Sequence, residues 1–312
     1  MDKDEGYTLT PIPGRPVARL LPDGCALVLE GGGLRGFYTS GVFEPLMRQG
    51  IMFPYVIGVS AGAANGLTYI SGQPERSRQV VANYVGSPRY VGVGNLLRIH
   101  SMFDYDYAFH VVPQRHVFFD WDSFYACPAR FLTGAMDCDT GRTVWFEKTD
   151  CNPDFVASIA SCSMPLVSRI VSFKGHRLLD GGVSDPIPIE RSLADGNRFH
   201  VIVLTRNPGY VKEPFRLMAW ARAAYREYPE VVAALGRRHE VYNRQLALCE
   251  QLEREGKAII IRPRQPLAVG RVKADTAKLL ALYDEGEREG AQAIPAILDH
   301  VRRLEDGKGG QS

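Results

Sequence analysis

Two short apolar runs, each followed by a glycine-containing turn and a helical pattern, constrain the fold more than any other feature of the sequence. They are Cys25–Glu30 (CALVLE) and Tyr55–Gly58 (YVIG). Such continuous apolar runs are typical of strands that are buried on both faces. Apolar residues recur at helical spacing between Arg35 and Gln49, and again from Ala61 to Ile70. This order predicts parallel strands joined by right-handed helical crossovers.

The rest of the chain continues the α/β pattern and then becomes mainly helical. Further strands are predicted at residues 130–136, 143–147, 176–179, 200–205 and 259–261. Helical patterns cover residues 155–161, 215–255 with a break near Pro229, and 276–282 and 291–303 with interruptions at Gly286, Gly290 and Pro295. We therefore expect an irregular lead-in at 1–24, an α/β domain at 25–208 and a mostly helical region at 209–312.

The composition narrows the class of protein. The 37 basic and 35 acidic residues give a formal charge of +2, so no global field favours nucleic acid as a partner. The first 24 residues contain no apolar run of signal-peptide length, and no stretch reaches the roughly 18 apolar residues of a membrane-spanning helix. We therefore expect a cytoplasmic protein that makes, at most, peripheral contact with a membrane.

The turn after the first strand reads Gly31-Gly-Gly-Leu-Arg-Gly36, which matches the GxGxxG fingerprint of dinucleotide-binding proteins. That fingerprint needs an acidic residue about 20 positions later, to hold the ribose. The corresponding segment, Met52–Val56, contains no acidic residue. The sequence therefore argues against a bound nucleotide.

The turn after the second strand reads Gly58-Val-Ser60-Ala-Gly62, the GxSxG pattern of a nucleophile elbow. A sharp turn of this kind lifts the serine hydroxyl above the edge of the sheet, and small residues at the glycine positions avoid clashes with the neighbouring strand and helix. Acyl transfer at such a serine passes through an oxyanion, which needs backbone N–H donors. The Gly31–Gly33 amides and the Ala61 amide are the candidate donors.

A third motif, Asp180-Gly181-Gly182, follows the strand predicted at residues 176–179. Taken alone, it would be a turn. A serine hydroxyl is a weak nucleophile without a base, however, so a carboxylate at a strand end is a candidate partner for Ser60.

In this order and context, GGGLRG, GVSAG and DGG resemble the patatin-like phospholipase family. The resemblance spans residues 25–189 and includes the segment Ala160–Pro165, which looks like the family's loop before the aspartate strand. It implies a three-layer α/β/α fold with a mainly parallel sheet. It also implies a lipid acyl hydrolase, of phospholipase A or lysophospholipase type, that acts on lipid or acyl-ester substrates in lipid catabolism or remodelling, without cofactor or metal.

The resemblance further implies a dyad in which Asp180 is the direct base for Ser60, with an acyl-serine intermediate. Gly31, Gly32, Gly33 and the Arg35 amide would form the oxyanion hole, together with Ala61. The remaining motif residues are Gly36, Gly58, Gly62, Gly181 and Gly182. The family's common form has alanine at the position of Gly182, and glycine there is a recognised variant.

Several alternatives stay open at this point. A non-catalytic lipid-binding protein would keep the same fold, and a histidine base would have to come from His176, His200, His239 or His300. Arg35 could form a surface ion pair, fix the glycine loop or meet an anionic head group. The nine aromatic residues between Phe103 and Tyr125 could pack as core or line an acyl pocket, and interleaved aspartates favour core packing.

Overall fold

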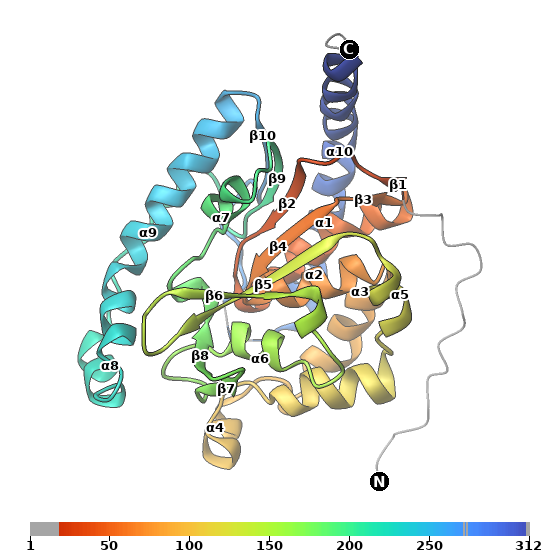
Figure 1. Ribbon diagram of the computed structural model, residues 1–312. Helices are drawn as coiled ribbons and strands as arrows, with labels where there is room; N and C mark the ends of the chain where they lie inside the picture. The colour runs from red at the N-terminus through yellow and green to blue at the C-terminus, as the bar shows by residue number, and fades with distance from the viewer. Residues whose placement is uncertain (1–18, 271, 273, 310–312) are drawn as a thin grey trace.

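An eight-stranded sheet forms the centre of the computed structural model, which describes residues 19–270, 272 and 274–309 (Figure 1). The strand order is β10-β9-β2-β4-β5-β8-β7, and β6 also pairs with β5. The strands are β2 (Cys25–Leu29), β4 (Tyr55–Val59), β5 (Arg130–Asp137), β6 (Thr143–Glu147), β7 (Val171–Phe173), β8 (His176–Asp180), β9 (Phe199–Val203) and β10 (Ala258–Ile261). From β10 to β5 every pairing is parallel, whereas β6, β7 and β8 pair antiparallel. The predicted mainly parallel sheet is confirmed.

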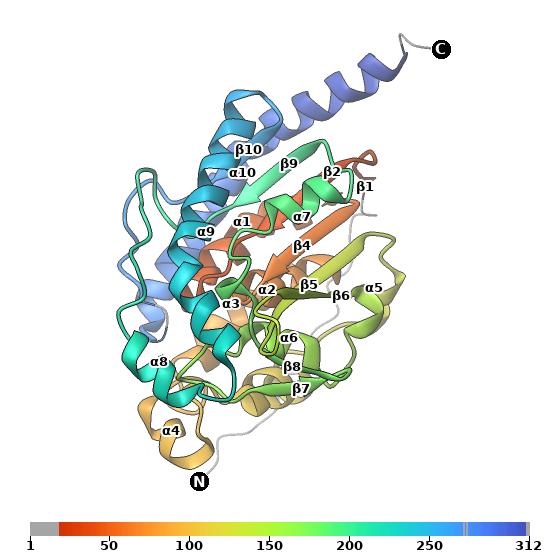
Figure 2. The same ribbon diagram turned by 60° about the vertical axis from the view of Figure 1, so that its left-hand side comes forward.

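Helices cover both faces of this sheet, which gives three layers (Figures 1 and 2). They are α1 (Phe37–Arg48), α2 (Ala61–Ile70), α3 (Arg76–Val80), α4 (Val93–Ile99), α5 (Trp121–Ala126), α6 (Val156–Cys162), α7 (Ile189–Ala194), α8 (Met218–Ala224), α9 (Pro229–Arg254) and α10 (Thr276–Gly309). Short 3-10 segments lie at Gly33–Gly36 (η1), Lys148–Asp150 (η4) and Gly181–Val183 (η5), and π-helical segments at Val81–Val85 (η2) and Tyr107–His116 (η3).

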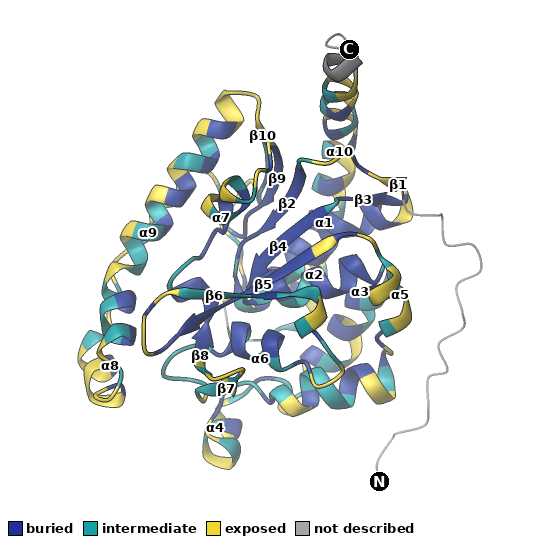
Figure 3. Cartoon of the chain, viewed as in Figure 1, coloured by how far each residue is buried: buried dark blue, intermediate teal, exposed yellow. Residues whose placement is uncertain are grey.

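Alternation along β2 explains the layers. Leu27 and Leu29 belong to the core that includes residues of α1 and α10, whereas Ala26 and Val28 belong to the core that includes residues of α9. Successive side chains of a strand point to opposite faces, so a strand without polar residues must be covered on both sides. Figure 3 shows the strands at the centre as mostly buried, whereas the helices and loops carry most of the exposed residues. The predicted three-layer fold is confirmed.

The strand order reverses direction at β2. The chain passes from β2 to β4 and β5 on one side, and β9 later joins β2 on the other side. In open α/β sheets, ligands bind beyond the carboxyl ends of the strands at such a switch point. The GGGLRG segment follows the carboxyl end of β2 at this point.

The C-terminal helix differs from the prediction. An interruption at Gly286, Gly290 and Pro295 was expected, but residues 276–309 form one helix. The two glycines lie one turn apart and pack directly against α1. An added Cβ at Gly286 would lie 2.1 Å from the Tyr38 carbonyl oxygen, and one at Gly290 would lie 2.4 Å from that of Val42. Close packing of α10 on α1 therefore outweighs the low helix propensity of glycine, which costs about 1 kcal/mol per residue.

The other predicted strands and helices are present, and their ends differ from the predicted ones by one to three residues. The strand β7, the helix α7 and the helical segments between residues 76 and 126 were not predicted from the sequence. Of the expected lead-in at 1–24, residues 1–18 lie outside the described residues, and Arg19–Leu20 (β1) pairs in parallel with Ile51–Met52 (β3). No helix within the described part of the chain is long and apolar enough to cross a membrane.

Candidate active site

Ser60 lies at the sharp turn between β4 and α2. Its backbone has φ 55° and ψ −130°, a conformation that a non-glycine residue adopts at a cost of about 1–3 kcal/mol. The turn fits tightly against β2, because an added Cβ at Gly62 would lie 2.6 Å from the Leu29 carbonyl oxygen, and one at Gly58 would lie 2.7 Å from the Gly62 carbonyl carbon. The two glycines of GVSAG therefore allow the strained turn that the motif predicted.

Asp180 reaches Ser60 from the end of β8. Ser60 Oγ donates a hydrogen bond of 2.7 Å to Asp180 Oδ2, and the Gly182 N–H donates one of 2.7 Å to Oδ1. Both residues are buried, with exposed fractions of 6% and 3%. Gly181 and Gly182 begin η5 directly after the aspartate. The two residues singled out by the motifs, 120 positions apart in sequence, are thus in direct contact.

A second serine supports this turn from behind. The Ser60 N–H donates to Ser161 Oγ at 2.7 Å, and Ser161 Oγ donates to the Gly134 carbonyl of β5 at 2.6 Å. Ser161 is fully buried on α6. The sequence offered one signal for it, its place in the segment 160–165 before the aspartate strand, but that signal gave no role to the side chain.

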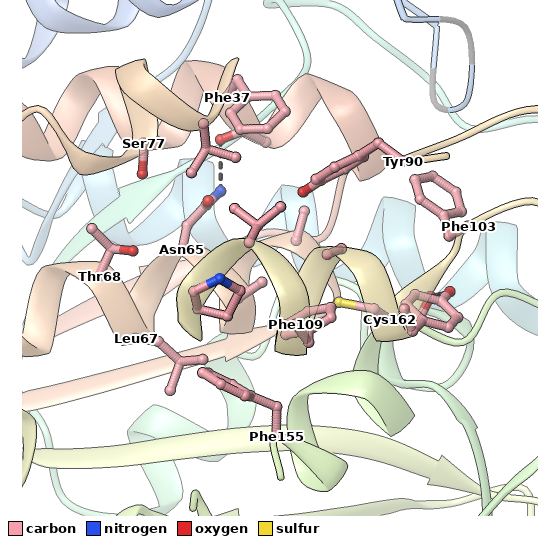
Figure 4. Close-up of a pocket in the computed structure, with 18 of the residues that line it drawn as sticks. Phe37, Asn65, Leu67, Thr68, Ser77, Tyr90, Phe103, Phe109, Phe155 and Cys162 are labelled. Carbon is pink, nitrogen blue, oxygen red and sulfur yellow. Dashed lines mark hydrogen bonds between the residues drawn. The ribbon is translucent and has the colours of Figure 1, made fainter. Parts of the chain in front are cut away.

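The glycine loop lies beside Ser60. Gly33 has φ +57°, in the left-handed region that glycine adopts without strain, and it begins η1. The Gly31 N–H makes a long hydrogen bond of 3.4 Å to the Pro186 carbonyl, and Gly32 packs against Thr205. The Gly36 carbonyl accepts a hydrogen bond of 2.7 Å from Asn65 Nδ2, which ties the loop to α2 (Figure 4).

The remaining candidates for the oxyanion hole are Ala61, next to Ser60, and Arg35, within the loop itself. Ala61 is the first residue of α2, so its N–H has no acceptor within the helix. Arg35 lies within η1 and is only 4% exposed, so the alternative of a surface ion pair is wrong. Arg35 is also not among the residues that line the three cavities described below, so these cavities give no support to contact with a head group.

Two cavities meet at Ser60, and Gly33 and Met164 line both of them. The first, which we call the apolar cavity, has a volume of about 140 Å³ (Figure 4). Apolar side chains from several elements dominate its wall, among them Phe37, Leu67, Phe103, Phe109 and Phe155. The second, which we call the polar cavity, is lined by Glu30, the three glycines of the loop, Asp180, Lys212 and Arg238. A bound molecule could therefore extend to both sides of the serine hydroxyl, with chemically different environments at its two ends.

The aromatic segment contributes both to the core and to a cavity. Four of its nine aromatic residues line the apolar cavity: Phe103, Tyr105, Phe109 and Phe119. Phe124 is fully buried, and its ring packs edge to face on Trp121. The interpretation as core holds for Tyr107, Phe119 and Phe124, which are buried in the main hydrophobic cluster. The interpretation as a pocket lining holds for the four residues of the cavity wall, and Phe119 serves in both.

Rival reactive groups are poorly placed or inert. Among the described residues, which include all seven histidines, no histidine lines either cavity that contains Ser60. His176 instead contacts Asp137, with 2.7 Å between Nδ1 and Oδ2. Cys162 does line the apolar cavity, but burial raises the pKa of its thiol well above the ordinary value. The thiol therefore stays protonated and a poor nucleophile.

Comparison with known proteins finds two family models that match parts of this chain. A family model described as patatin-like phospholipase matches residues 27–193, more than half of the chain. This chain belongs to the patatin-like phospholipase family. A second model, a domain of unknown function (DUF6363), matches residues 228–302.

Individual relatives of this patatin-like protein match over part of their length. It is 30% identical over 198 residues to the uncharacterized protein YjjU of Escherichia coli K12, covering 59% of this chain and 52% of that protein. It is 27% identical over 215 residues to "Lysophospholipase NTE1" of Mycosarcoma maydis, covering 61% of this chain and 11% of that protein. This chain thus spans about half of the first relative and about a tenth of the second. The solved structure of VipD from Legionella pneumophila aligns with a TM-score of 0.41 and 13% identity, over 90% of this chain and 67% of that one.

Proposed function

We propose that this patatin-like protein is a lipid acyl hydrolase in which Ser60 is the nucleophile and Asp180 its base. The observation that carries the proposal is the 2.7 Å hydrogen bond from Ser60 Oγ to Asp180 Oδ2 at the point where the two cavities meet. The name of the fungal relative, a lysophospholipase, supports an ester of phospholipase A or lysophospholipase type as the substrate.

The proposed reaction has two halves. Ser60 Oγ attacks the ester carbonyl carbon while its proton passes to Asp180, and collapse of the tetrahedral intermediate expels the alcohol, which takes that proton. Water then attacks the acyl-serine, again with Asp180 accepting the proton, and the fatty acid leaves as Ser60 recovers its hydrogen. General-base assistance of this kind contributes about 10²–10⁴ in rate.

The oxyanion of each half-reaction is assigned to backbone N–H groups of Gly31, Gly32, Gly33, Arg35 and Ala61. Gly33 and Ala61 have the strongest support, because both line the apolar cavity together with Ser60. Gly31 is the weakest of the set, because its N–H already points toward the Pro186 carbonyl. One such donor lowers the barrier by about 3–4 kcal/mol.

In this proposal the apolar cavity holds the acyl chain. Its wall of aromatic and aliphatic side chains begins at Ser60, so a fatty acyl group whose carbonyl meets the serine would extend into it (Figure 4). The alcohol portion of the ester would then occupy the polar cavity.

Peripheral contact with a lipid surface is part of the proposal. Leu97 on α4 and Trp220 on α8 are 87% and 71% exposed, and both helices lie at the lower end of the molecule in two views (Figures 1 and 2). Exposed large apolar side chains are common in segments that rest in a membrane interface. Replacing Leu97 with glutamate should reduce co-sedimentation with phospholipid vesicles, and unchanged co-sedimentation would exclude α4 from the contact.

The decisive test of the chemistry uses Ser60→Ala and Asp180→Asn, with Ser158→Ala as a control. Ser158 is also a buried serine, on α6, and it is not among the residues that line the cavities. Hydrolysis of p-nitrophenyl acyl esters and labelling by a fluorophosphonate should disappear in Ser60→Ala, and hydrolysis should fall at least about 10²-fold in Asp180→Asn. If Ser60→Ala still turned over ester, Ser60 would not be the nucleophile. Binding of vesicles without any serine-dependent turnover would favour the lipid-binding alternative.

A further inference from the structure

A third cavity continues the polar cavity away from Ser60. We call it the outer cavity; it has a volume of about 340 Å³ and is lined by residues 210–216 together with Arg238 and His239. Lys212 and Arg238 line both the polar and the outer cavity, so they stand where the two meet. Both residues lie outside the segment 27–193 that matches the patatin-like family.

The polar and outer cavities share two cationic side chains but differ in their acidic residues. In the polar cavity two carboxylates oppose the two cations, and both carboxylates already accept backbone hydrogen bonds, Glu30 from the Thr205 N–H and Asp180 from the Gly182 N–H. In the outer cavity the acidic residue is Glu213, which forms an ion pair with Arg216. The lining of the outer cavity thus contains two more cationic than acidic side chains, and its cations Lys212 and Arg238 also line the polar cavity beside the two carboxylates.

The two cations are held in position by the surrounding structure. Arg238 Nε donates a hydrogen bond of 2.7 Å to the carbonyl of Gly182, two residues after the proposed base. The backbone of Lys212 is clamped by Asn243 of α9, which accepts from its N–H at 2.9 Å and donates to its carbonyl at 3.1 Å. Lys212 Nζ also lies 4.6 Å from the centre of the Tyr242 ring. A prearranged pair of cations binds an anion with less loss of side-chain entropy than two mobile ones.

We propose that Lys212 and Arg238 form a binding site for a phosphate group on the alcohol portion of the substrate. The inference rests on the proposed function, and deepens it by assigning the head-group side of the site to the region after residue 208. An acyl chain in the apolar cavity places the ester carbonyl at Ser60 and directs the alcohol toward these two residues. The planar guanidinium of arginine and the compact ammonium of lysine both suit phosphate oxygens.

Two soluble substrates with the same octanoyl chain test the inference, namely 1-octanoylglycerol 3-phosphate and 1-octanoylglycerol. The wild-type protein should have the higher kcat/KM for the phosphate ester. Lys212→Met should lower kcat/KM for the phosphate ester by roughly 10- to 100-fold more than for the neutral ester, as expected for the loss of a charged hydrogen bond. Lys257→Met is the matched control, because this substitution also removes one positive charge. Lys257 is an exposed lysine that pairs with Glu255, and it lines none of the three cavities.

Free phosphate distinguishes a head-group site from a general anion site. At constant ionic strength, glycerol 3-phosphate should compete with the phosphate ester better than inorganic phosphate does, and Lys212→Met should weaken both competitors. Inhibition by inorganic phosphate without any preference for the phosphate ester would overturn the proposed head-group role.

Failure of this inference and failure of the proposed function give different results. Equal kcat/KM for the two esters in the wild type, or equal losses in Lys212→Met, would overturn the phosphate site while Ser60-dependent hydrolysis of 1-octanoylglycerol still stood. Arg238→Met removes the hydrogen bond to Gly182 together with the charge, so Lys212→Met is the main test. Comparison of Arg238→Lys, which keeps the charge, with Arg238→Met supplements it. Arg238→Lys should keep more of the preference for the phosphate ester than Arg238→Met, and equal preferences in the two variants would count against a role for the charge.

Discussion

Ser161→Ala tests whether the strained turn at Ser60 depends on the buried hydroxyl behind it. The substitution removes the acceptor of the Ser60 N–H and the donor to the Gly134 carbonyl. A buried N–H left without a partner costs about 1–3 kcal/mol. The unusual φ of Ser60 costs a similar amount, about 1–3 kcal/mol, so the loss of this support is large enough to let the turn relax.

Two measurements should change together in Ser161→Ala. The free energy of unfolding, from denaturant titration, should fall by about 1–3 kcal/mol. Ester hydrolysis should fall by roughly 10- to 100-fold with Ser60 and Asp180 both intact, because each 1.4 kcal/mol spent on restoring the reactive turn costs a factor of about ten.

The matched control for this experiment is Ser158→Ala, on the same helix. Ser158 is buried, and its Oγ has no hydrogen-bond partner within the described residues, so its removal should leave both quantities nearly unchanged. If Ser161→Ala matched Ser158→Ala in stability and in turnover, the hydroxyl of Ser161 would not support the turn, and the reasoning from the two hydrogen bonds would be refuted.

Three further substitutions test other parts of the structure. Gly286→Ala should destabilise the protein by at least about 1–3 kcal/mol in denaturant unfolding, since its Cβ would meet the Tyr38 carbonyl, whereas Gly94→Ala on α4, with open space around it, should not. Burial lowers the pKa of His200 to about 4 from 6.5, so only the unfolded chain takes up a proton between these values. The free energy of unfolding should therefore have its full value above about pH 6.5 and fall by up to about 3 kcal/mol as the pH drops toward 4. This pH dependence should shrink in His200→Leu. Ala64→Phe, which fills the apolar cavity from α2, should reduce hydrolysis of dodecanoyl esters more than of acetyl esters, and equal losses would argue that the acyl chain lies elsewhere.

The sequence predicted the parts of the site that are local in the chain. Ser60 and Asp180 each lie at the end of a strand, within a short motif. The pattern of apolar residues in such a strand can be recognised in the sequence without knowing which strands it pairs with. The direction of β8 was not readable in the same way, because the side-chain alternation of a strand is the same whether its partner is parallel or antiparallel.

Contacts between distant residues that belong to no motif were out of reach of pattern reading. Arg238 reaches Gly182 across 56 positions, and nothing in the helical pattern of α9 distinguishes this arginine from the solvated ones. The segments Val81–Val85 and Tyr107–His116 were missed for another reason. Both are π-helical, with i→i+5 hydrogen bonds, so their apolar residues do not recur at the 3.6-residue spacing that marks an α-helix.

The division of the chain at residue 208 stays a prediction, and the contacts across it allow a sharp test. The strand β9 pairs with β10 on one side and β2 on the other, so a fragment ending at residue 208 would leave β9 as an open edge. It would also lose α9 and α10, whose residues share the two cores with β2. Residues 1–208 expressed alone should therefore aggregate or bind a hydrophobic dye such as ANS, and should hydrolyse even neutral esters poorly, since Arg238 no longer contacts the Gly182 turn. A monomeric fragment that unfolds cooperatively and keeps wild-type turnover of 1-octanoylglycerol would instead establish residues 1–208 as an independent catalytic unit.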